Sequence, residues 1–466
     1  MRSAVRGRVV AGILFTLVLL SLVVLTACGS TTNIQGSLNR STGGMVQVTI
    51  GDAPSDRIAA FSITINSISL ATDAGNSVSL VSSPVTVEIT QLSGTTQPVA
   101  TLTIPAGTYT KASITLGTAT VTLVDPATGE ASQKTLPAPP TVTLTLNPAF
   151  ALSVSPLVLN LDLNLASSIT IDASGNIGFN PRFIETHGPL GGPGTTPTPL
   201  NGGLEHLFGN VSSVSGSSFT LAIGNQTLTF TTNGSTQFAN LSGVGQITAG
   251  MLLIVSAQTQ SDGSLLATRV AAINVIPTSI GALGLVRTVN RTTSQLQLFV
   301  RRAAGTALTP FVGAGLLVDF NSNTAFRFDS DGVDLSNLPF IPAFAADNIA
   351  PGQFVEVDTT SPPVGTTTVI GGLSGIEIAA TQITLEQEPL IGIVSGYTGG
   401  ATFTLNLPAD SVFAIVTKAT AVTVYKQPGT VNLTNISNGS TVIVRGLLFV
   451  DSGTYKMVAG RILATP

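Results

Sequence analysis

The sequence is poor in the residues that carry most enzyme chemistry. It contains one cysteine, two histidines and no tryptophan among 466 residues. A single cysteine permits neither an intramolecular disulfide nor a cysteine-rich metal site. Nucleophilic and zinc-dependent hydrolysis generally need a histidine on a rigid scaffold, whereas His187 and His206 flank a proline-rich segment. We therefore predict that the protein is not an enzyme. The alternative is a catalytic carboxylate pair assembled only in three dimensions, which one sequence does not reveal.

Charge is also scarce. Only 9% of the residues are charged while 43% are hydrophobic, the formal net charge is −4, and no segment is dense in Lys and Arg. Such basic clusters bind nucleic acids and anionic lipid head groups, so we expect neither partner. Thr and Val suit a pleated, half-buried surface, whereas the strong helix formers Glu, Lys and Arg are few. The composition therefore predicts an all-β protein with little helix.

The first 27 residues have the anatomy of an export signal peptide. Arg2, Arg6 and Arg8 precede an apolar run over residues 9–25, and small residues follow that run. The run is about long enough to cross a bilayer as a helix, so an uncleaved membrane anchor is the alternative. The segment ends in a tetrapeptide that resembles the lipobox of bacterial lipoproteins: Leu25, Thr26, Ala27 and Cys28.

The lipobox resemblance implies that the signal helix is removed before Cys28 and that this cysteine carries diacylglycerol and fatty acyl chains such as palmitate. Several acyl chains hold a protein durably at a membrane. Cleavage would leave 16 bases against 23 acids and a net charge of −7. The following Gly29 and Ser30 resemble the start of lipoproteins sent to the outer membrane. We expect an exported protein, anchored at the outer membrane or cell surface, with residues 28–44 as a flexible tether.

Residues 45–186 predict an antiparallel β-sandwich. Apolar residues alternate with Thr, Ser, Asn or Gln in short runs, which places them on one face of a strand. The longest run, residues 157–165, alternates leucine with Asn and Asp. About ten such runs separated by turn residues are typical of a sandwich.

Two motifs in this region support that interpretation. They are VTIGDAP at residues 48–54 and IPAGTYT at residues 104–110. Together they resemble a domain-of-unknown-function family found at the N-terminus of many bacterial lipoproteins, with TDAP and LPAGTYT signatures. The resemblance covers about residues 44–186 and departs at Gly51, where the family usually has Thr. It implies a fold and a location but no chemistry.

A Pro, Gly and Thr-rich segment at residues 187–203 predicts a semi-rigid linker. Beyond it, one order of motifs recurs three times and predicts small β-barrel-like units over residues 204–276, 280–386 and 389–466. The spacing resembles a second domain-of-unknown-function family of tandem small β-barrels in exported bacterial proteins. Each unit has a glycine before a strand that we expect to supply a positive φ at a tight turn: Gly250, Gly352 and Gly439.

The second unit carries an insertion near residues 329–346 with the most site-like cluster of the chain. Asp329, Asp331 and Asp334 surround Gly332, and their carboxylates offer the hard oxygens that calcium prefers. The cluster lacks the closing bidentate Glu of an EF-hand loop, and a polar turn explains it equally well. Calcium is thus the one candidate cofactor, with a structural turn as the alternative.

Taken together, these features predict a membrane-tethered, non-enzymatic envelope lipoprotein with a structural or protein-interaction role, whose partners are the membrane and an unidentified envelope protein. A calcium- or glycan-binding surface module is the alternative. A sugar site built on stacked aromatics is disfavoured, because the chain has no Trp and only four Tyr.

Overall fold

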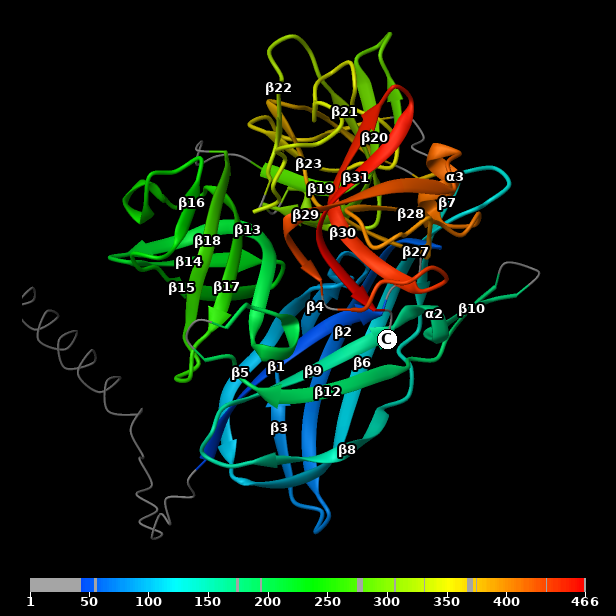
Figure 1. Cartoon of the computed structure of the whole chain (residues 1–466). Coiled ribbons are helices and arrows are strands. Elements are labelled where there is room, and N and C mark those ends of the chain that lie inside the picture. Colours follow the sequence, from blue (N-terminus) through cyan, green and yellow to red (C-terminus); the bar gives the residue numbers. More distant parts are fainter. Residues whose placement is uncertain are drawn as a thin grey trace, which may run out of the picture. The chain divides into compact units, whose positions relative to one another are not determined.

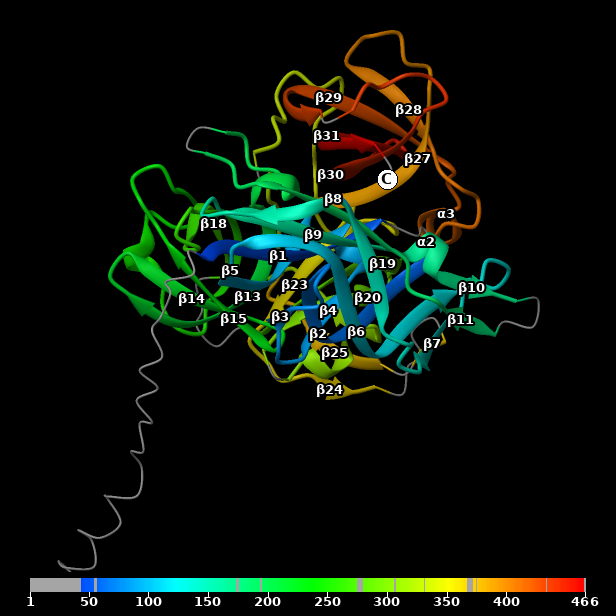
Figure 2. The same ribbon diagram turned by 90° about the horizontal axis from the view of Figure 1, so that it is seen from below.

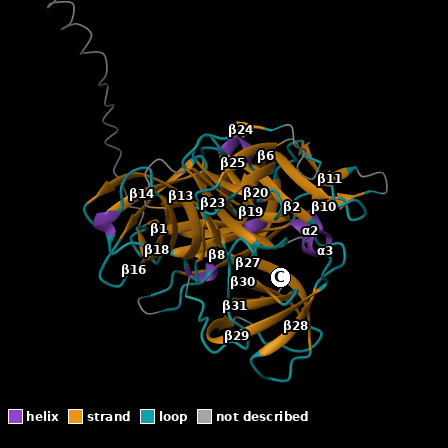
Figure 3. Ribbon diagram, turned by 90° about the horizontal axis from the view of Figure 1, so that it is seen from above, coloured by secondary structure: helices purple, strands orange, loops and turns teal. Residues whose placement is uncertain are grey.

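The structure is a computed structural model that describes residues 43–53, 57–172, 176–192, 195–274, 280–305, 307–330, 332–366, 372–373, 375–432 and 434–464. The signal peptide, the lipobox and most of the tether lie outside these residues. Residues 42–466 form one compact unit. Figure 3 shows that strands dominate it, with only short helices such as α2 (Leu165–Ser168) and α3 (Val412–Thr417). The all-β prediction is confirmed. No helix among the described residues has the length and apolarity needed to span a membrane.

The N-terminal region is the predicted sandwich of two sheets. One sheet has the order β12-β9-β1-β5, and the other has the order β3-β2-β6-β7, with β4 added to β2 and β8 added to β6. Leu159, Leu161 and Leu163 are fully buried in the core between the sheets, as the alternation predicted. The strands are β1 (Gly43–Ala53), β2 (Ile58–Thr72), β3 (Ser77–Val81), β4 (Val85–Glu88), β5 (Thr96–Pro105), β6 (Gly107–Val124), β7 (Ala131–Leu136), β8 (Val142–Leu152), β9 (Leu157–Asn164), β12 (Phe183–Pro189) and the separate pair β10 (Ile169–Ile171) and β11 (Ile177–Phe179).

One pair of strands departs from the predicted antiparallel pattern. β1 runs parallel to β9, with Val48 opposite Leu159. Parallel neighbours need a long crossover connection, and here the whole second sheet lies between them in the chain. The 3-10 helix η1 (Thr90–Leu92) joins β4 to β5 within that crossover.

The segment predicted as a linker is shorter and more ordered than the sequence suggested. β12 continues to Pro189, and His187 lies on this strand opposite Leu159. Beyond it the chain folds back, because the Gly191 amide donates to the Asn201 carbonyl at 2.8 Å, and the 3-10 helix η2 (Pro199–Asn201) follows. A hydrogen-bonded turn of this kind is not an extended spacer.

The rest of the chain forms three β-barrel-like units with one strand order (Figures 1 and 2). In each, the first strand pairs antiparallel with the second strand and with one later strand, and the third strand runs parallel to a strand near the end of the unit. The first unit has β13 (Gly203–Ser215), β14 (Ser218–Ile223), β15 (Gln226–Thr231), β16 (Gln237–Ala239), η3 (Val244–Gln246), β17 (Leu252–Thr259) and β18 (Leu265–Asn274). The second has β19 (Ile280–Asn290), β20 (Gln295–Ala304), η4 (Thr309–Phe311), β21 (Gly315–Asp319), β22 (Ala325–Phe328), β23 (Phe354–Thr359), β24 (Val364–Gly365), β25 (Gly375–Ala379) and β26 (Gln382–Leu385). The third has β27 (Glu388–Ser395), β28 (Thr402–Asn406), β29 (Ala421–Asn432), β30 (Thr441–Asp451) and β31 (Thr454–Ala464).

The expected turn glycines precede β17, β23 and β30. Gly250, Gly352 and Gly439 have φ values of 90°, 84° and 87°. Only glycine enters this left-handed region at little cost, so the predicted positive φ is confirmed.

The insertion of the second barrel packs against the third barrel. The ring of Phe340 lies 5.4 Å from that of Tyr425 and 6.0 Å from that of Phe449, measured between centroids. The ammonium of Lys456 sits over Phe340 at 4.7 Å. The insertion therefore supplies apolar contacts that join two barrels, as well as the acidic turn that the sequence displayed.

Candidate functional site

Buried polar side chains gather where the sandwich and the barrels meet, and we call this region the junction. Four of its arginines are at least nine-tenths buried, with exposed fractions of 4% to 9%. Buried charges are expensive unless they are hydrogen-bonded, so their partners define what the junction does. The arginines are Arg301, Arg302, Arg445 and Arg461.

The arginines of the junction donate mainly to main-chain carbonyls of a neighbouring unit. Arg301 Nε donates to the Ala59 carbonyl at 2.9 Å, and Arg302 Nη1 donates to the His206 carbonyl at 2.6 Å. Arg445 Nη1 donates to the Gln91 carbonyl at 3.3 Å. Of the ten arginines in the described residues, seven reach from one unit to another in this way or through a carboxylate: Arg57, Arg269, Arg287, Arg301, Arg302, Arg445 and Arg461.

A β-bulge places two consecutive arginines on the same face of β20. Leu283 pairs with Arg302 and Gly284 pairs with Val300, so Arg301 is an extra residue without a partner in the ladder. Neighbouring residues of a regular strand point to opposite faces, and a bulge cancels that alternation. Both guanidinium groups therefore leave the barrel interior and line the same cavity outside it.

Three carboxyl groups of the sandwich lie in or beside the junction. Glu88 accepts from the Phe61 amide at 2.8 Å and from Thr90 Oγ1 at 2.6 Å, and Ser93 Oγ donates to Asp52 at 3.0 Å. Burial raises the pKa of Glu88 and holds the pKa of Asp52 well above its usual range, with the charge of Asp162 adding to the rise for Asp52. Burial raises the pKa of Asp162 to about 7.

A fourth buried carboxyl group belongs to the second barrel. Glu356 on β23 is fully buried, and neither carboxylate oxygen has a hydrogen-bond partner among the described residues. Burial, followed by repulsion from Asp358 and Glu386, holds its pKa well above the ordinary value. Glu356 therefore keeps its proton to a higher pH than an ordinary glutamate.

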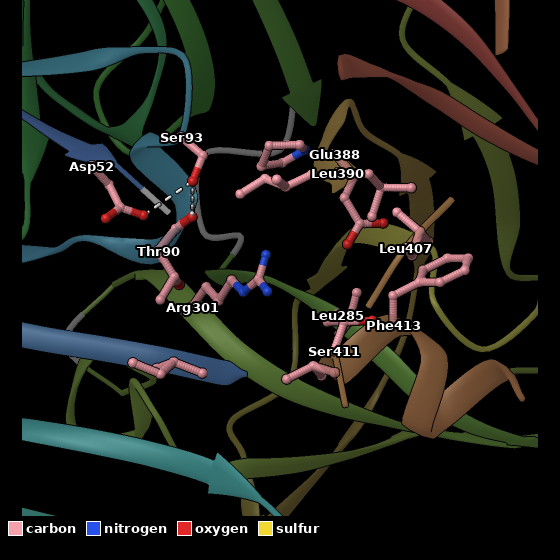
Figure 4. A pocket seen from close by; sticks show the side chains of 14 residues that line it. Asp52, Thr90, Ser93, Leu285, Arg301, Glu388, Leu390, Leu407, Ser411 and Phe413 are labelled. Carbon is pink, nitrogen blue, oxygen red and sulfur yellow. Dashed lines mark hydrogen bonds between the residues drawn. The ribbon is translucent and has the colours of Figure 1, made fainter. Parts of the chain in front are cut away.

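Two cavities meet at Arg301. The smaller, of about 40 Å³, is shown in Figure 4, where Arg301 lies between Thr90 and Ser93 on one side and Leu285 and Ser411 on the other. The larger has a volume of about 380 Å³ and lies between the sandwich and the first two barrels. Its walls carry two guanidinium groups, several hydroxyls and amides, and a patch of apolar side chains. The larger cavity falls in the size range of small-molecule sites.

The two histidines do not form a catalytic pair. His187 Nδ1 lies 2.5 Å from Glu185 Oε1 on the sandwich strand β12. His206 has a positive φ of 56° on β13, and its carbonyl accepts from Arg302. The prediction that the protein is not an enzyme stays a prediction.

The aspartates of the calcium candidate are only partly described. Asp329 pairs with Arg269 of the first barrel, and Asp334 accepts from the Ser336 amide at 2.8 Å. Asp331 lies outside the described residues. Within the described ranges no group of three His, Cys, Asp or Glu residues has the arrangement of a metal site. The calcium site stays a prediction.

The junction residues were not among the candidates predicted from the sequence, although the sequence contains a weak indication of them. Arg301 and Arg302 are the only adjacent basic pair in an arginine-poor chain, and Glu88 and Glu356 interrupt strands of apolar residues. Acids or arginines on the apolar face of a predicted strand indicate a buried polar contact. Their partners are far away in sequence, so that signal does not identify the contact.

Comparison with known proteins finds two family models that match parts of the chain. Residues 43–181 match the family described as Domain of unknown function (DUF4382), and residues 208–271 match Domain of unknown function (DUF5666). No curated protein matches. Among solved structures, the single-stranded DNA binding protein from Thermus aquaticus is similar over 40% of this chain and 91% of its own length. That similarity has 13% identity and a TM-score of 0.14, and it supports no conclusion about fold or function.

Proposed function

We propose that this protein is a lipid-anchored, non-enzymatic lipoprotein of the cell envelope whose body serves as a rigid interaction scaffold. The observation that carries the proposal is the use of seven of ten described arginines to join one unit to another. Domains of one chain usually move relative to one another unless their interface is extensive. Arginine contacts to main-chain carbonyls at several interfaces oppose such motion. They hold the outer surfaces of the units in fixed positions relative to one another.

The anchor half of the proposal rests on the sequence Leu25 to Cys28, which lies outside the described residues. Cys28→Ala should keep its leader and carry no lipid, because acylation of the thiol precedes cleavage in the proposed route. Mass spectrometry of the wild-type N-terminal peptide should find diacylglyceryl-modified Cys28. Ser30→Ala is the matched control and should be processed and acylated like the wild type. An unmodified thiol in the processed wild-type protein would refute the anchor.

The scaffold half predicts that Arg445 secures the third barrel to the sandwich. Arg445→Gln removes a charge-assisted hydrogen bond to the Gln91 carbonyl and should cost about 1.5–3 kcal/mol in the free energy of unfolding. Hydrogen exchange should become faster in residues 90–95, the segment that this guanidinium covers. Arg327→Gln is the control, since Arg327 is exposed. Equal exchange rates in the two variants would show that Arg445 does not hold the units together.

A further inference from the structure

We propose that the larger cavity binds a small polyhydroxylated carboxylate, of the chemical class of a sugar acid, through Arg301 and Arg302. This inference goes beyond the scaffold role and does not depend on lipid anchoring. The proposal rests on the pair of guanidinium groups that the bulge in β20 brings to one wall of the cavity.

The first argument is the unused hydrogen-bonding capacity of Arg301. Its side chain is 7% exposed, and among the described residues its only hydrogen bond runs from Nε to the Ala59 carbonyl. Its guanidinium lies 5.6 Å from the ring centroid of Phe354, which holds the plane in place without using a donor. The two terminal amino groups thus remain available at the wall of the cavity. A guanidinium presents them in the fork that a carboxylate accepts.

The second argument is the charge balance of the cavity. Glu88 is the acid on its wall, and its oxygens already accept from Phe61, Thr90 and Gln91. Arg301 and Arg302 therefore outnumber the wall's acidic groups. Burial lowers the pKa of Arg302 to about 10, because a buried cation loses its hydration. An anion bound beside the two guanidinium groups would balance the excess positive charge of the wall.

The third argument is the chemistry of the remaining wall, which suits a ligand with hydroxyl groups. Ser62, Thr86 and Thr120 bring hydroxyls from the sandwich. Asn225, on the β14–β15 turn, donates to the Pro84 carbonyl and accepts from the Thr86 amide, so its side chain closes the wall between the sandwich and the first barrel. Phe208, Ile223 and Val312 provide an apolar patch for the face of a ring. Pockets of this kind combine an apolar wall with a few polar groups that fix orientation.

The test uses the full processed protein in detergent and three probes: glucuronate, glucose and inorganic phosphate. We expect saturable binding of glucuronate in calorimetry, a rise in Tm, and weaker binding as salt is raised. Glucose and phosphate should bind at least about tenfold more weakly, because glucose lacks the carboxylate and phosphate lacks the ring. No saturable glucuronate binding up to about 10 mM would overturn the proposal. Equal binding of glucose, or tighter binding of phosphate, would overturn the assigned ligand class.

Variants separate a binding role from a structural one. Arg301→Gln should weaken glucuronate binding by about tenfold or more. Because that residue also contacts the sandwich, Val312→Trp provides an independent test: the indole occupies the part of the cavity where we expect the ring of the ligand, and both arginines stay in place. It should abolish binding while keeping the Tm of the ligand-free protein. Arg327→Gln should bind like the wild type. Unchanged affinity in Val312→Trp would place any binding elsewhere and refute this site.

Discussion

Asp162→Asn should raise the free energy of unfolding by up to about 4 kcal/mol at about pH 8 and leave it nearly unchanged at about pH 4. Burial raises the pKa of Asp162 from 3.8 to about 7 in the folded protein. Below pH 3.8, both the folded and the unfolded protein hold the proton on Asp162. As the pH rises, the unfolded state releases it first, so stability falls up to about pH 7 and then stays low. Asparagine carries no such proton and removes this pH dependence.

Denaturant unfolding across the pH range measures this effect. The matched control is Asp262→Asn, an exposed turn residue whose pKa is lowered by the Ser264 hydroxyl and amide. A lowered pKa has the opposite sign: its contribution is present above the ordinary value and is lost on acidification. The wild-type loss of stability between about pH 4 and 7 should therefore persist in Asp262→Asn and shrink in Asp162→Asn. The same pH profile in both variants would show that Asp162 is ordinarily ionised.

Gly209→Ala should destabilise the first barrel by about 3 kcal/mol. A Cβ at this position would lie 2.1 Å from the Ala222 carbonyl oxygen of the neighbouring strand β14. That oxygen is main chain and cannot rotate away, so the two strands would have to separate. Thermal unfolding measures the loss.

The control for this variant is Gly234→Ala in the same barrel. A Cβ there meets nothing within 4 Å, and Gly234 has no positive φ. That replacement should be neutral or stabilise by about 0.4–1 kcal/mol, since alanine has fewer conformations in the unfolded chain. A Tm for Gly209→Ala that equals the Tm of the control would mean that the strand crossing is not sterically fixed.

The glycine contact recurs in all three barrels. Gly284 would place a Cβ 2.4 Å from the Phe299 carbonyl oxygen, and Gly392 would place one 2.4 Å from that of Asn406. Each glycine lies on the first strand of its barrel and meets the second strand. The glycine on the first strand of each barrel is thus a point of close strand approach, which its neighbours in the sequence do not reveal.

Local patterns predicted local structure well. The alternation of leucines over residues 157–165 indicates which side chains enter the sandwich core, because a strand exposes every second residue to each face. Gly250 and its two counterparts were identified as turn glycines because a positive φ depends on one residue and its immediate neighbours. The parallel pairing of β1 with β9 was not predicted, since it depends on residues more than a hundred positions apart.

The junction was not predicted either, because its contacts also join residues that are far apart in the sequence. Asp162 was placed correctly on the outer face of its strand, but the sequence does not show that this face is covered. Gln47, on that face of β1, is fully buried beside Gly202 and Gln258 of the first barrel region. The sequence did not indicate that Arg301 and Arg302 lie on the same face of their strand. One extra residue in the bulge breaks the alternation on which strand prediction depends.

The arginine contacts of the junction have a consequence for how this chain tolerates substitution. A main-chain carbonyl such as that of Ala59, Gln91 or His206 is present whatever side chain occupies the position. The side chain at each acceptor position can therefore be replaced without loss of the hydrogen bond, whereas the arginine that donates cannot. Relatives of this protein should keep the guanidinium groups and vary the residues that receive them, so a comparison of sequences would show invariant donors without matching invariant acceptors.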